Sequence, residues 1–535
     1  MTRDFKNFLT KYEEKVIPLT KEVNLAYFKA TTTGDEKLYQ EMEALEIKRS
    51  QIYANKEDFN RLKKIKESNA LTDTLLKRQL YLIYNQYLAK QISEGQLQKM
   101  ITLQTDLEKR FSTFRAIIDD KKYTDNEIEQ ILRTSRNSTR LEKAWKASKE
   151  VGKNVAEDVL KLVQMRNAAA RELGFDNYHS MQLSLSEQDP QQIETLFNEL
   201  DNLTRDAFTQ LKKQIDNSLA RRYRIKVQSL KPWHYQNRFF QEAPRIYRLD
   251  LDRYYRDKDL VNITRQYFSS IGLPIDDLIA RSDLFEREGK YQHAYCTDID
   301  RMGDVRVVCN VAPDQYWMNT LLHEYGHAVY DKFNDRNVPW TLREPAHTFT
   351  TEAIAILFGS FASNPYWLKD VLEVPTSEIN RIADNSFKIQ RLETLVFSRW
   401  AQVMYHFEKA MYQDPSQDLN KLWWKLVEKY QMVKAPEGRN EPDWASKIHV
   451  ALYPAYYHNY LMGYLLAAQF YNYISTEILQ AENVTAQSFY DDKKVGNYLV
   501  EKVFKPGSRS HWNDMIESAT GEKLTAKYYA RQFIE

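Results

Sequence analysis

Two histidines and a glutamate with helical spacing stand at His323, Glu324 and His327, in the run His-Glu-Tyr-Gly-His. Residues four apart project from the same face of an α-helix, so both imidazoles can reach one metal ion. Glu324 is placed to meet a water on the metal rather than the metal itself. The pattern predicts a metal-dependent hydrolytic centre carried by a helix.

A third protein ligand has to come from another part of the chain. Glu352 follows His327 after the 24 residues 328–351, enough for one helix to end and a second to pack antiparallel to it. Thr350 or Thr351 can N-cap that second helix, which places Glu352 in its first turn. Glu344 is the rival third ligand, although it follows a loop-like stretch. Two histidines and one carboxylate leave the fourth tetrahedral position of zinc open, which is the catalytic arrangement.

The alternative is a chance pattern on an amphipathic helix, with Glu324 in solvent and the histidines satisfied in a core. Apolar flanking residues predict a buried helix instead: Leu321, Leu322, Ala328 and Val329. A buried helix needs a reason to carry three polar groups, because burying them without partners is costly. With Glu352 available, the pattern favours a metal site.

The composition predicts a mainly α protein. In 535 residues there are only 14 glycines and 15 prolines, and no Pro/Gly/Ser-rich linker divides the chain. Both counts disfavour a turn-rich β protein. The 76 basic and 74 acidic residues are well mixed and give a net charge of +2. Such a balance offers no field for nucleic acid or a membrane.

Compartment and redox state are open at this stage. The sequence has no apolar run long enough for a transmembrane helix, and its first residues lack the apolar core of a signal peptide. We expect a cytoplasmic protein if the chain is complete, and a periplasmic or secreted one if a signal peptide was removed. Two cysteines, Cys296 and Cys309, can form one disulfide or remain free thiols.

Helices are expected along most of the chain. From Asp4 to about Pro190 the apolar residues recur at three and four, which predicts long amphipathic helices that act as scaffold and lid. The sequence predicts another long helix over Gln191–Arg222. The one convincing strand signal lies near Asp298–Val311 and predicts a hairpin just before the metal helix. An edge strand in that place could pair with an extended peptide.

A second cluster with chemical potential follows later in the chain, where Lys447 and His449 precede Tyr457 and Tyr460. One interpretation is an aromatic helix face that fills a core. The other is a functional site, because a lysine, a histidine and several phenols are costly to bury without a role.

These motifs, taken together and in order, resemble the angiotensin-converting enzyme (peptidyl-dipeptidase A) family of zinc peptidases. The resemblance runs nearly end to end and rests on many short matches. They are His293-Ala294, His323-Glu324-x-Gly326-His327, Leu342-Arg343-Glu344, Glu352-Ala353-Ile354, Trp423-Trp424 with Lys429-Tyr430-Gln431, Lys447-x-His449, Pro454-x-x-Tyr457-x-x-Tyr460, Ala519-Thr520-Gly521-Glu522 and Leu524-Thr525-Ala526.

The resemblance implies a single peptidase domain over residues 1–535, an almost all-α ellipsoid whose two halves flank a deep cleft, with one zinc ion per chain. It also implies a role for each matching residue. His323, His327 and Glu352 would bind zinc, Glu324 would act as base, His449 and Tyr460 would steady the reaction intermediate, Lys447 and Tyr457 would hold the substrate's C-terminal carboxylate, and His293 and Ala294 would contact the peptide main chain. The family's carboxylate-binding glutamine falls at Tyr235 or Gln236, with Gln236 preferred.

The sequence departs from the family pattern at several positions. Two arginines that bind an activating chloride in animal members are replaced by Val427 and Asn459, which counts against chloride activation through that site. Ile356 stands where the family often has an acidic residue, four positions after the zinc glutamate, so the surroundings of the metal differ.

The expected function is the removal of C-terminal dipeptides from oligopeptides that have a free C-terminal carboxylate, by a monomeric enzyme. The nearest alternative is a zinc oligoendopeptidase or a single-residue carboxypeptidase on a related helical fold. A non-catalytic peptide-binding scaffold is less favoured, because Glu324 is retained.

Overall fold

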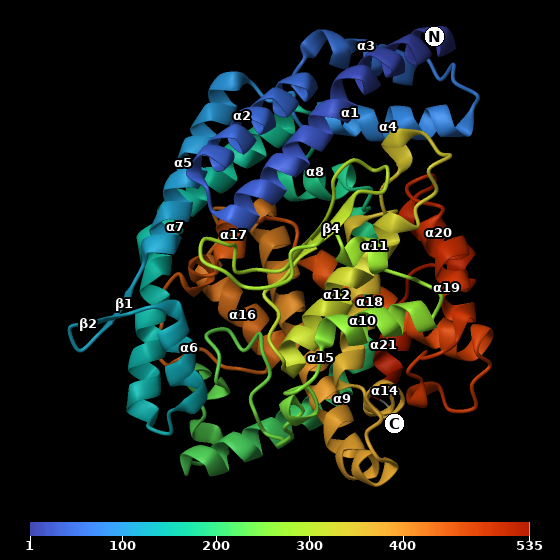
Figure 1. Cartoon of the computed structure of the whole chain (residues 1–535). Helices are drawn as coiled ribbons and strands as arrows, with labels where there is room; N and C mark the ends of the chain where they lie inside the picture. Colours follow the sequence, from blue (N-terminus) through green and yellow to red (C-terminus); the bar gives the residue numbers. More distant parts are fainter. Residues whose placement is uncertain (534–535) are drawn as a thin grey trace. The chain divides into compact units, whose positions relative to one another are not determined.

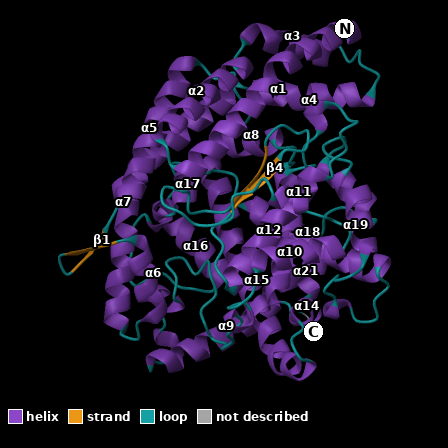
Figure 2. Ribbon diagram, in the orientation of Figure 1, coloured by secondary structure: helices purple, strands orange, loops and turns teal. Residues whose placement is uncertain are grey.

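The computed structural model describes residues 1–533, and helices make up most of them (Figures 1 and 2). Strands in the described residues form two short antiparallel pairs. β1 (Ala116–Ile118) pairs with β2 (Lys121–Tyr123), and β3 (Tyr295–Asp298) pairs with β4 (Val305–Val308). The prediction of a mainly α fold with a small hairpin beside the metal helix is confirmed.

The chain forms two compact units, and each is assembled from segments that are distant in sequence. Unit 1 consists of residues 1–91, 249–386 and 462–528, and unit 2 of residues 92–248, 387–461 and 529–535. Three helices cross from one unit to the other along the chain: α15 (Thr376–Gln413), α18 (His458–Tyr473) and α21 (Lys527–Arg531). The single peptidase domain expected from the sequence stays a prediction.

Unit 1 contains the first four helices of the chain and the helices around the predicted metal motif. Its long helices and short turns have these bounds: α1 Thr2–Thr33, α2 Glu36–Tyr53, α3 Lys56–Glu67, α4 Thr74–Leu88, α10 Leu260–Ser270, α11 Asp276–Ile279, α12 Gln315–Lys332, α13 Thr348–Ser360, α14 Pro365–Leu372, α19 Lys493–Leu499 and α20 Trp512–Thr520, with 3-10 turns at Asp252–Tyr254, Trp340–Leu342, Phe361–Ser363 and Val484–Ala486 and π-helical turns at Ile474–Ile478 and Val500–Phe504.

Unit 2 contains the second cluster that the sequence singles out. Its elements have these bounds: α5 Glu94–Thr113, β1 and β2, α6 Asp125–Thr134, α7 Ser138–Glu172, α8 Tyr178–Leu185, α9 Pro190–Tyr223, α16 Leu419–Gln431 and α17 Ile448–Leu452, with 3-10 turns at Val227–Ser229, Pro232–Tyr235 and Asp443–Ser446.

The predicted helix at Gln191–Arg222 is α9, and its start follows from the sequence. Pro190 stands at the first helical position, where a missing N–H costs nothing, and Asp189 accepts the N–H groups of Gln191 and Gln192. The helix ends at Tyr223, followed by Arg224 in a left-handed conformation. Local capping therefore fixes this element to within a residue or two.

The β1–β2 hairpin interrupts a region that the sequence predicts as helix after helix. Ile118 pairs with Lys121, so the loop has two residues, Asp119 and Asp120. Both have positive φ, at 48° and 63°. Two-residue hairpin loops need this conformation, and aspartate tolerates it better than most residues. Six strand residues are too few to give a clear alternating pattern.

Unit 1 places the β3–β4 hairpin against α12, as the sequence predicts. The chain leaves β4 at Val308, earlier than the predicted Val311, and Asp314 then caps α12 by accepting the N–H of Trp317 at 2.8 Å. The buried face of α12 includes Leu321, Leu322 and Tyr325. In Figure 1, α10 lies beside α12, and the two helices are in contact.

Among the described residues, no helix is both long enough and apolar enough to cross a lipid bilayer.

Candidate metal centre and active site

The side chains of His323, His327 and Glu352 meet in unit 1. His323 Nε2 lies 3.8 Å from Glu352 Oε1, and His327 Nε2 lies 3.6 Å from Glu352 Oε2. One possible ligand atom from each residue lies within 4.8 Å of the other two. Ligands about 2.0–2.2 Å from a tetrahedral zinc ion would be about 3.3–3.6 Å apart. The three side chains therefore fit a zinc ion with a small adjustment.

Glu352 comes from α13, which begins earlier than the sequence predicts. The N-cap is His347, not Thr350 or Thr351. His347 Nδ1 accepts the N–H of Phe349, and Thr350 Oγ1 accepts the N–H of His347. This reciprocal pair forms a capping box in which a histidine takes the place of the usual serine or threonine. Glu352 consequently lies in the second turn of α13.

Two glycines allow the helices around Glu352 to approach closely. A Cβ atom on Gly326 of α12 would lie 2.8 Å from Ala355 Cα and 3.1 Å from Ile354 O of α13. A Cβ atom on Gly463 of α18 would lie 3.0 Å from Glu352 Cγ. Any larger residue at either place would displace α13 or the Glu352 side chain. Gly326 is the fourth residue of the motif. Helix packing, and not the chemistry of the site, requires a glycine at this position.

The two histidines are held in the neutral form that a metal requires. Burial lowers the pKa of His323 to about 4, and burial together with His323 lowers the pKa of His327 to about 3. His327 Nδ1 lies 2.8 Å from Thr351 Oγ1, which fixes the ring and leaves Nε2 toward Glu352. Burial also raises the pKa of Glu352 to about 7 when no cation is beside it. A bound cation would stabilise the charged carboxylate and so offset this effect of burial.

Glu324 follows His323 on α12 and is only 8% exposed. Burial, and to a lesser extent Glu352, raises its pKa to about 8. A carboxylate that exchanges its proton near neutral pH suits a general base. The rival ligand Glu344 is not in the metal group; it forms an ion pair with Arg301.

One cavity of about 610 Å³ in unit 1 contains the metal group and Glu324. Ala294 and β3 form part of its wall, as do residues of α1 and α2. His293 lies next to Ala294, is exposed, and packs its ring 5.1 Å from that of Tyr291. The cavity is polar, which suits a peptide main chain better than a lipid.

The residues predicted to hold a carboxylate meet in unit 2. Lys447 is 8% exposed, and its Nζ lies 5.4 Å from the ring centroids of Phe239 and Trp400 and 5.6 Å from that of Tyr457. Burial is the main reason that its pKa falls to about 7. A lysine in such apolar surroundings gains much from an anionic partner.

His449 and Tyr460 belong to the same aromatic group in unit 2. The His449 ring lies 5.1 Å from that of Tyr457, and the Tyr457 ring lies 5.4 Å from that of Tyr460. Burial, together with Lys447, lowers the pKa of His449 to about 4. Trp400 Nε1 donates a hydrogen bond to the Tyr457 hydroxyl at 2.8 Å. The structure therefore brings together four of the predicted residues of unit 2.

Gln236 is not the hydrogen-bond partner of Lys447. Its Oε1 accepts the backbone N–H of Arg245, and Tyr235, the other candidate, donates its hydroxyl to Asp216. The glutamine that contacts Lys447 is Gln241, whose Oε1 accepts a hydrogen bond from Lys447 Nζ at 2.6 Å. Sequence reasoning missed Gln241, because it lies 206 residues from Lys447 in a segment without a regular pattern.

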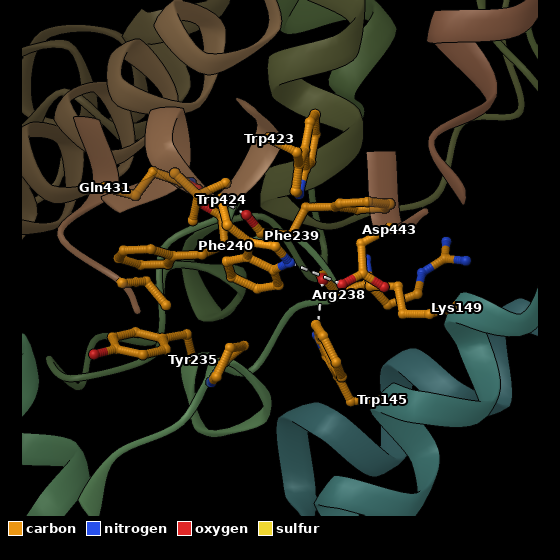
Figure 3. A pocket seen from close by; sticks show the side chains of 13 residues that line it. Trp145, Lys149, Tyr235, Arg238, Phe239, Phe240, Trp423, Trp424, Gln431 and Asp443 are labelled. Carbon is orange, nitrogen blue, oxygen red and sulfur yellow. Dashed lines mark hydrogen bonds between the residues drawn. The ribbon is translucent and has the colours of Figure 1, made fainter. Parts of the chain in front are cut away.

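The two positions associated with chloride have different surroundings in this chain. Val427 lines a small pocket of unit 2 with aromatic residues and the buried Lys149, whose Nζ lies 3.3 Å from the Phe239 ring centroid (Figure 3). Figure 3 also shows Trp424 donating to Asp443. Asn459 is buried and accepts a hydrogen bond from Gln188. Neither position supplies a cation, and chloride independence through this site stays a prediction.

Cys296 and Cys309 are free thiols in the structure. Cys296 lines the metal-site cavity, whereas Cys309, the residue directly after β4, is fully buried. Burial raises the pKa of both thiols well above the usual value, so neither is a ready nucleophile.

Two histidines from α12, Glu352 from α13 and the neighbouring Glu324 fit the type of centre that a zinc peptidase needs, on a helical fold. The model of the angiotensin-converting enzyme family matches residues 2–235 and 240–533. The chain belongs to the angiotensin-converting enzyme family of zinc metallopeptidases. The match is interrupted at residues 236–239, just before Gln241. In this segment the sequence alone does not decide which residue is the carboxylate-binding glutamine.

Individual relatives are distant. Angiotensin-converting enzyme of Sus scrofa is 24% identical over 473 residues, which cover 80% of this chain and 35% of that protein. Thermostable carboxypeptidase 1 of Pyrococcus furiosus is 22% identical over 315 residues (54% and 60%), and oligoendopeptidase F of Lactococcus lactis subsp. cremoris is 24% identical over 208 residues (37% and 33%). The chain spans about a third of the length of the first of these relatives.

We predict that replacing Glu352 by glutamine releases zinc, whereas the same change at Glu344 does not. The first change removes one of three proposed ligands, and the second leaves all three in place. We expect zinc affinity to fall by about 100-fold or more for Glu352→Gln, given that even outer partners of a metal site contribute about 10- to 100-fold. Zinc content after dialysis against a weak chelator measures this. Greater loss from Glu344→Gln would identify Glu344 as the ligand.

Proposed function

We propose that the protein is a zinc-dependent peptidyl-dipeptidase, which removes dipeptides from the free C-terminus of oligopeptides. The observation that carries the proposal is the meeting of His323, His327 and Glu352 in one cavity with the buried Glu324. The Lys447 group adds a site for the terminal carboxylate. The proposal requires one peptide to bind both groups at once.

His323, His327 and Glu352 would hold the zinc ion. When bound, zinc supplies the positive charge that makes water acidic enough to attack a peptide carbonyl at neutral pH. Glu324 accepts the proton of the attacking water and then donates it to the leaving amine. Its burial supports this role, because the raised pKa lets the carboxylate both take and give a proton near neutrality.

His449 and Tyr460 are proposed to donate hydrogen bonds to the oxyanion that forms at the carbonyl. Loss of one such donor typically lowers the rate by about 10²- to 10³-fold. Tyr460 lies on α18, three residues before Gly463, the residue that packs against Glu352. The position of Tyr460 on the same helix as Gly463 supports a role for Tyr460 in the reaction.

Lys447, Gln241 and Tyr457 are proposed to hold the C-terminal carboxylate. The lysine offers a cation, and the glutamine already bonded to it can offer its amide N–H₂ after a rotation of the side chain. A carboxylate held there fixes the register of the peptide, so that cleavage occurs about two residues before the end. The expected product is a dipeptide.

A second candidate is a carboxypeptidase that removes single residues, or an oligoendopeptidase. The names of the relatives from Pyrococcus furiosus and Lactococcus lactis favour keeping it. Mass spectrometry of the products of a blocked tetrapeptide with a free C-terminus separates the dipeptidase from the single-residue carboxypeptidase, and amidation of the C-terminus separates both from an endopeptidase. A released dipeptide supports the first proposal, and a released single residue supports the second.

We expect Glu324→Gln to retain zinc and lose nearly all turnover, because glutamine cannot accept the proton. The rate should fall by about 10²-fold or more. Glu288→Gln, a neutralising change at an exposed position of unit 1, serves as the control and should leave both properties unchanged. Zinc content and initial rates are measured on the same samples. Normal hydrolysis by Glu324→Gln would remove Glu324 from the mechanism.

Amidation of a substrate's C-terminus should weaken binding by about 10- to 100-fold, because it leaves the buried Lys447 cation without its anionic partner. Acetylation of the N-terminus of a peptide of six or more residues should have little effect. The Michaelis constants of the free, amidated and acetylated forms of one peptide provide the measurement. Equal effects at both ends would indicate an endopeptidase.

The affinity for a free carboxylate should decrease as the pH rises above 7. Since the pKa of Lys447 is about 7 in the free protein, its ammonium is fully present below that pH and is lost above it. We expect the affinity to fall about tenfold per pH unit above 7, until the pKa of the complex is reached. The ratio of the dissociation constants of free and amidated peptides, measured with Glu324→Gln protein, isolates this effect. A ratio constant from pH 6 to 9 would exclude Lys447.

A further inference from the structure

A third acidic position lies on the same face of α12 as the two histidines. His323, His327 and Asp331 are spaced at four and four, so their side chains follow one another along the helix. Asp331 lines the cavity that contains the metal group. No described residue forms a hydrogen bond or an ion pair with its carboxylate within the usual distance limits. Asp331 is therefore a cavity carboxyl group without a hydrogen-bond partner among the described residues, and the proposed mechanism gives it no role.

Asp298, at the end of β3, lines the same cavity and lies close enough to Asp331 to affect its titration. Its Oδ1 accepts the backbone N–H groups of Asp300 and Arg301. Burial raises the pKa of Asp298 to about 6, and burial followed by repulsion from Asp298 raises that of Asp331 well above its usual value. Both carboxyl groups would therefore be stabilised by a positive charge arriving in the cavity.

The arginines of the cavity wall have other partners. Arg301 forms an ion pair with Glu344, and its guanidinium lies 4.2 Å from the Trp340 ring centroid. Arg49 is paired with Glu46, and Arg343 donates its Nε–H to Val338 O. Arg301 is the cation that offsets the charge of Asp331 in part, but it does not bond to it.

A second metal ion is not a suitable occupant. Of the described His, Cys, Asp and Glu side chains, the one group of three that could share a metal ion is His323, His327 and Glu352. An organic cation needs fewer ligands than a metal and can use two carboxylates in the wall of a peptide-sized cavity.

We infer that Asp331, assisted by Asp298, selects substrates with a positively charged group on the N-terminal side of the cleaved bond. This inference rests on the proposed function, in which the C-terminal dipeptide is held by the Lys447 group, so that the remaining part of the peptide occupies the cavity of unit 1. Asp331 is one helical turn beyond His327, about 6 Å along the axis. An extended peptide advances about 3.3 Å per residue, so the cation belongs to about the second residue before the cleaved bond.

The test uses zinc-loaded protein and a series of acetylated pentapeptides, Ac-Ala-X-Ala-Phe-Leu, in which X is lysine, norleucine or glutamate. Norleucine matches the carbon chain of lysine without its charge. A further pair, Ala-Ala-Phe-Leu with and without an acetyl group, places the peptide's own α-amino group at the same residue. The variants are Asp331→Asn and, as a control, the exposed Glu288→Gln. Two readouts are taken: kcat/KM for release of Phe-Leu, and the dissociation constant measured with Glu324→Gln protein, alone and combined with each variant.

We expect lysine to exceed norleucine by about 10- to 100-fold in both readouts, as is typical of a hydrogen bond between charged groups, with glutamate the poorest. In Asp331→Asn the lysine advantage should fall to about twofold or less, while hydrolysis of the norleucine peptide persists and shows that the variant is folded and loaded. Glu288→Gln should keep the full advantage. An advantage from the lysine side chain assigns the cation to the second residue, and an advantage from the free α-amino group alone assigns it to the substrate's N-terminus; both support the inference.

Equal binding of the lysine and norleucine peptides, together with no gain from the free α-amino group, would overturn the inference. So would an advantage that survives in Asp331→Asn. Failure of the proposed function has a different signature: no peptide of the series would release Phe-Leu. The dissociation constants then still decide whether Asp331 selects a cation.

Discussion

The close crossing of α12 and α13 is the constraint on which the candidate metal centre depends. The two histidines come from one helix and the glutamate from the next, and neither helix can bring three ligand atoms together alone. The crossing is possible because residue 326 has no side chain, and a Cβ atom there would lie 2.8 Å from Ala355 Cα. Apolar residues of α12, such as Leu321 and Val329, bury its remaining surface and hold the crossing in place. Packing therefore determines the chemistry, since the separation of α12 and α13 sets the distance from Glu352 to the two histidines.

Burial has opposite effects on the acidic and basic groups of the two units. It keeps His323 and His327 neutral, raises the pKa of Glu324 and lowers that of Lys447. Each group is thereby less stable in its charged form and gains more from the right partner. These groups do not neutralise one another, and each becomes more stable when a metal ion, an anion or a cation binds beside it. Such a distribution of unpaired charge is typical of sites that bind ligands.

Much of this arrangement could be predicted from the sequence, and the parts that could not share a physical cause. Spacing of four residues predicts the histidine pair, and the strand pattern near Asp298 predicts the hairpin beside α12. Short-range rules failed where a side chain acts in an unusual place, as when His347 caps α13. They also failed for Gln241, which meets Lys447 only through the tertiary fold, and for β1–β2, which is too short to show a period. Asp331 was visible in the sequence, one turn beyond His327, but its exposure to the cavity was not.

The interleaving of the two units has a consequence for how the chain is made. Unit 1 takes residues from the beginning, the middle and the end of the sequence, and unit 2 takes those between. During synthesis, Gly463 leaves the ribosome 111 residues after Glu352, the residue against which it packs in the folded protein. Contacts between such distant segments form slowly, and their partners stay exposed in the meantime. A nascent chain that ends before residue 462 lacks the last of the three segments of unit 1, so the pocket that would hold zinc is not finished until residues 462–528 have been synthesised.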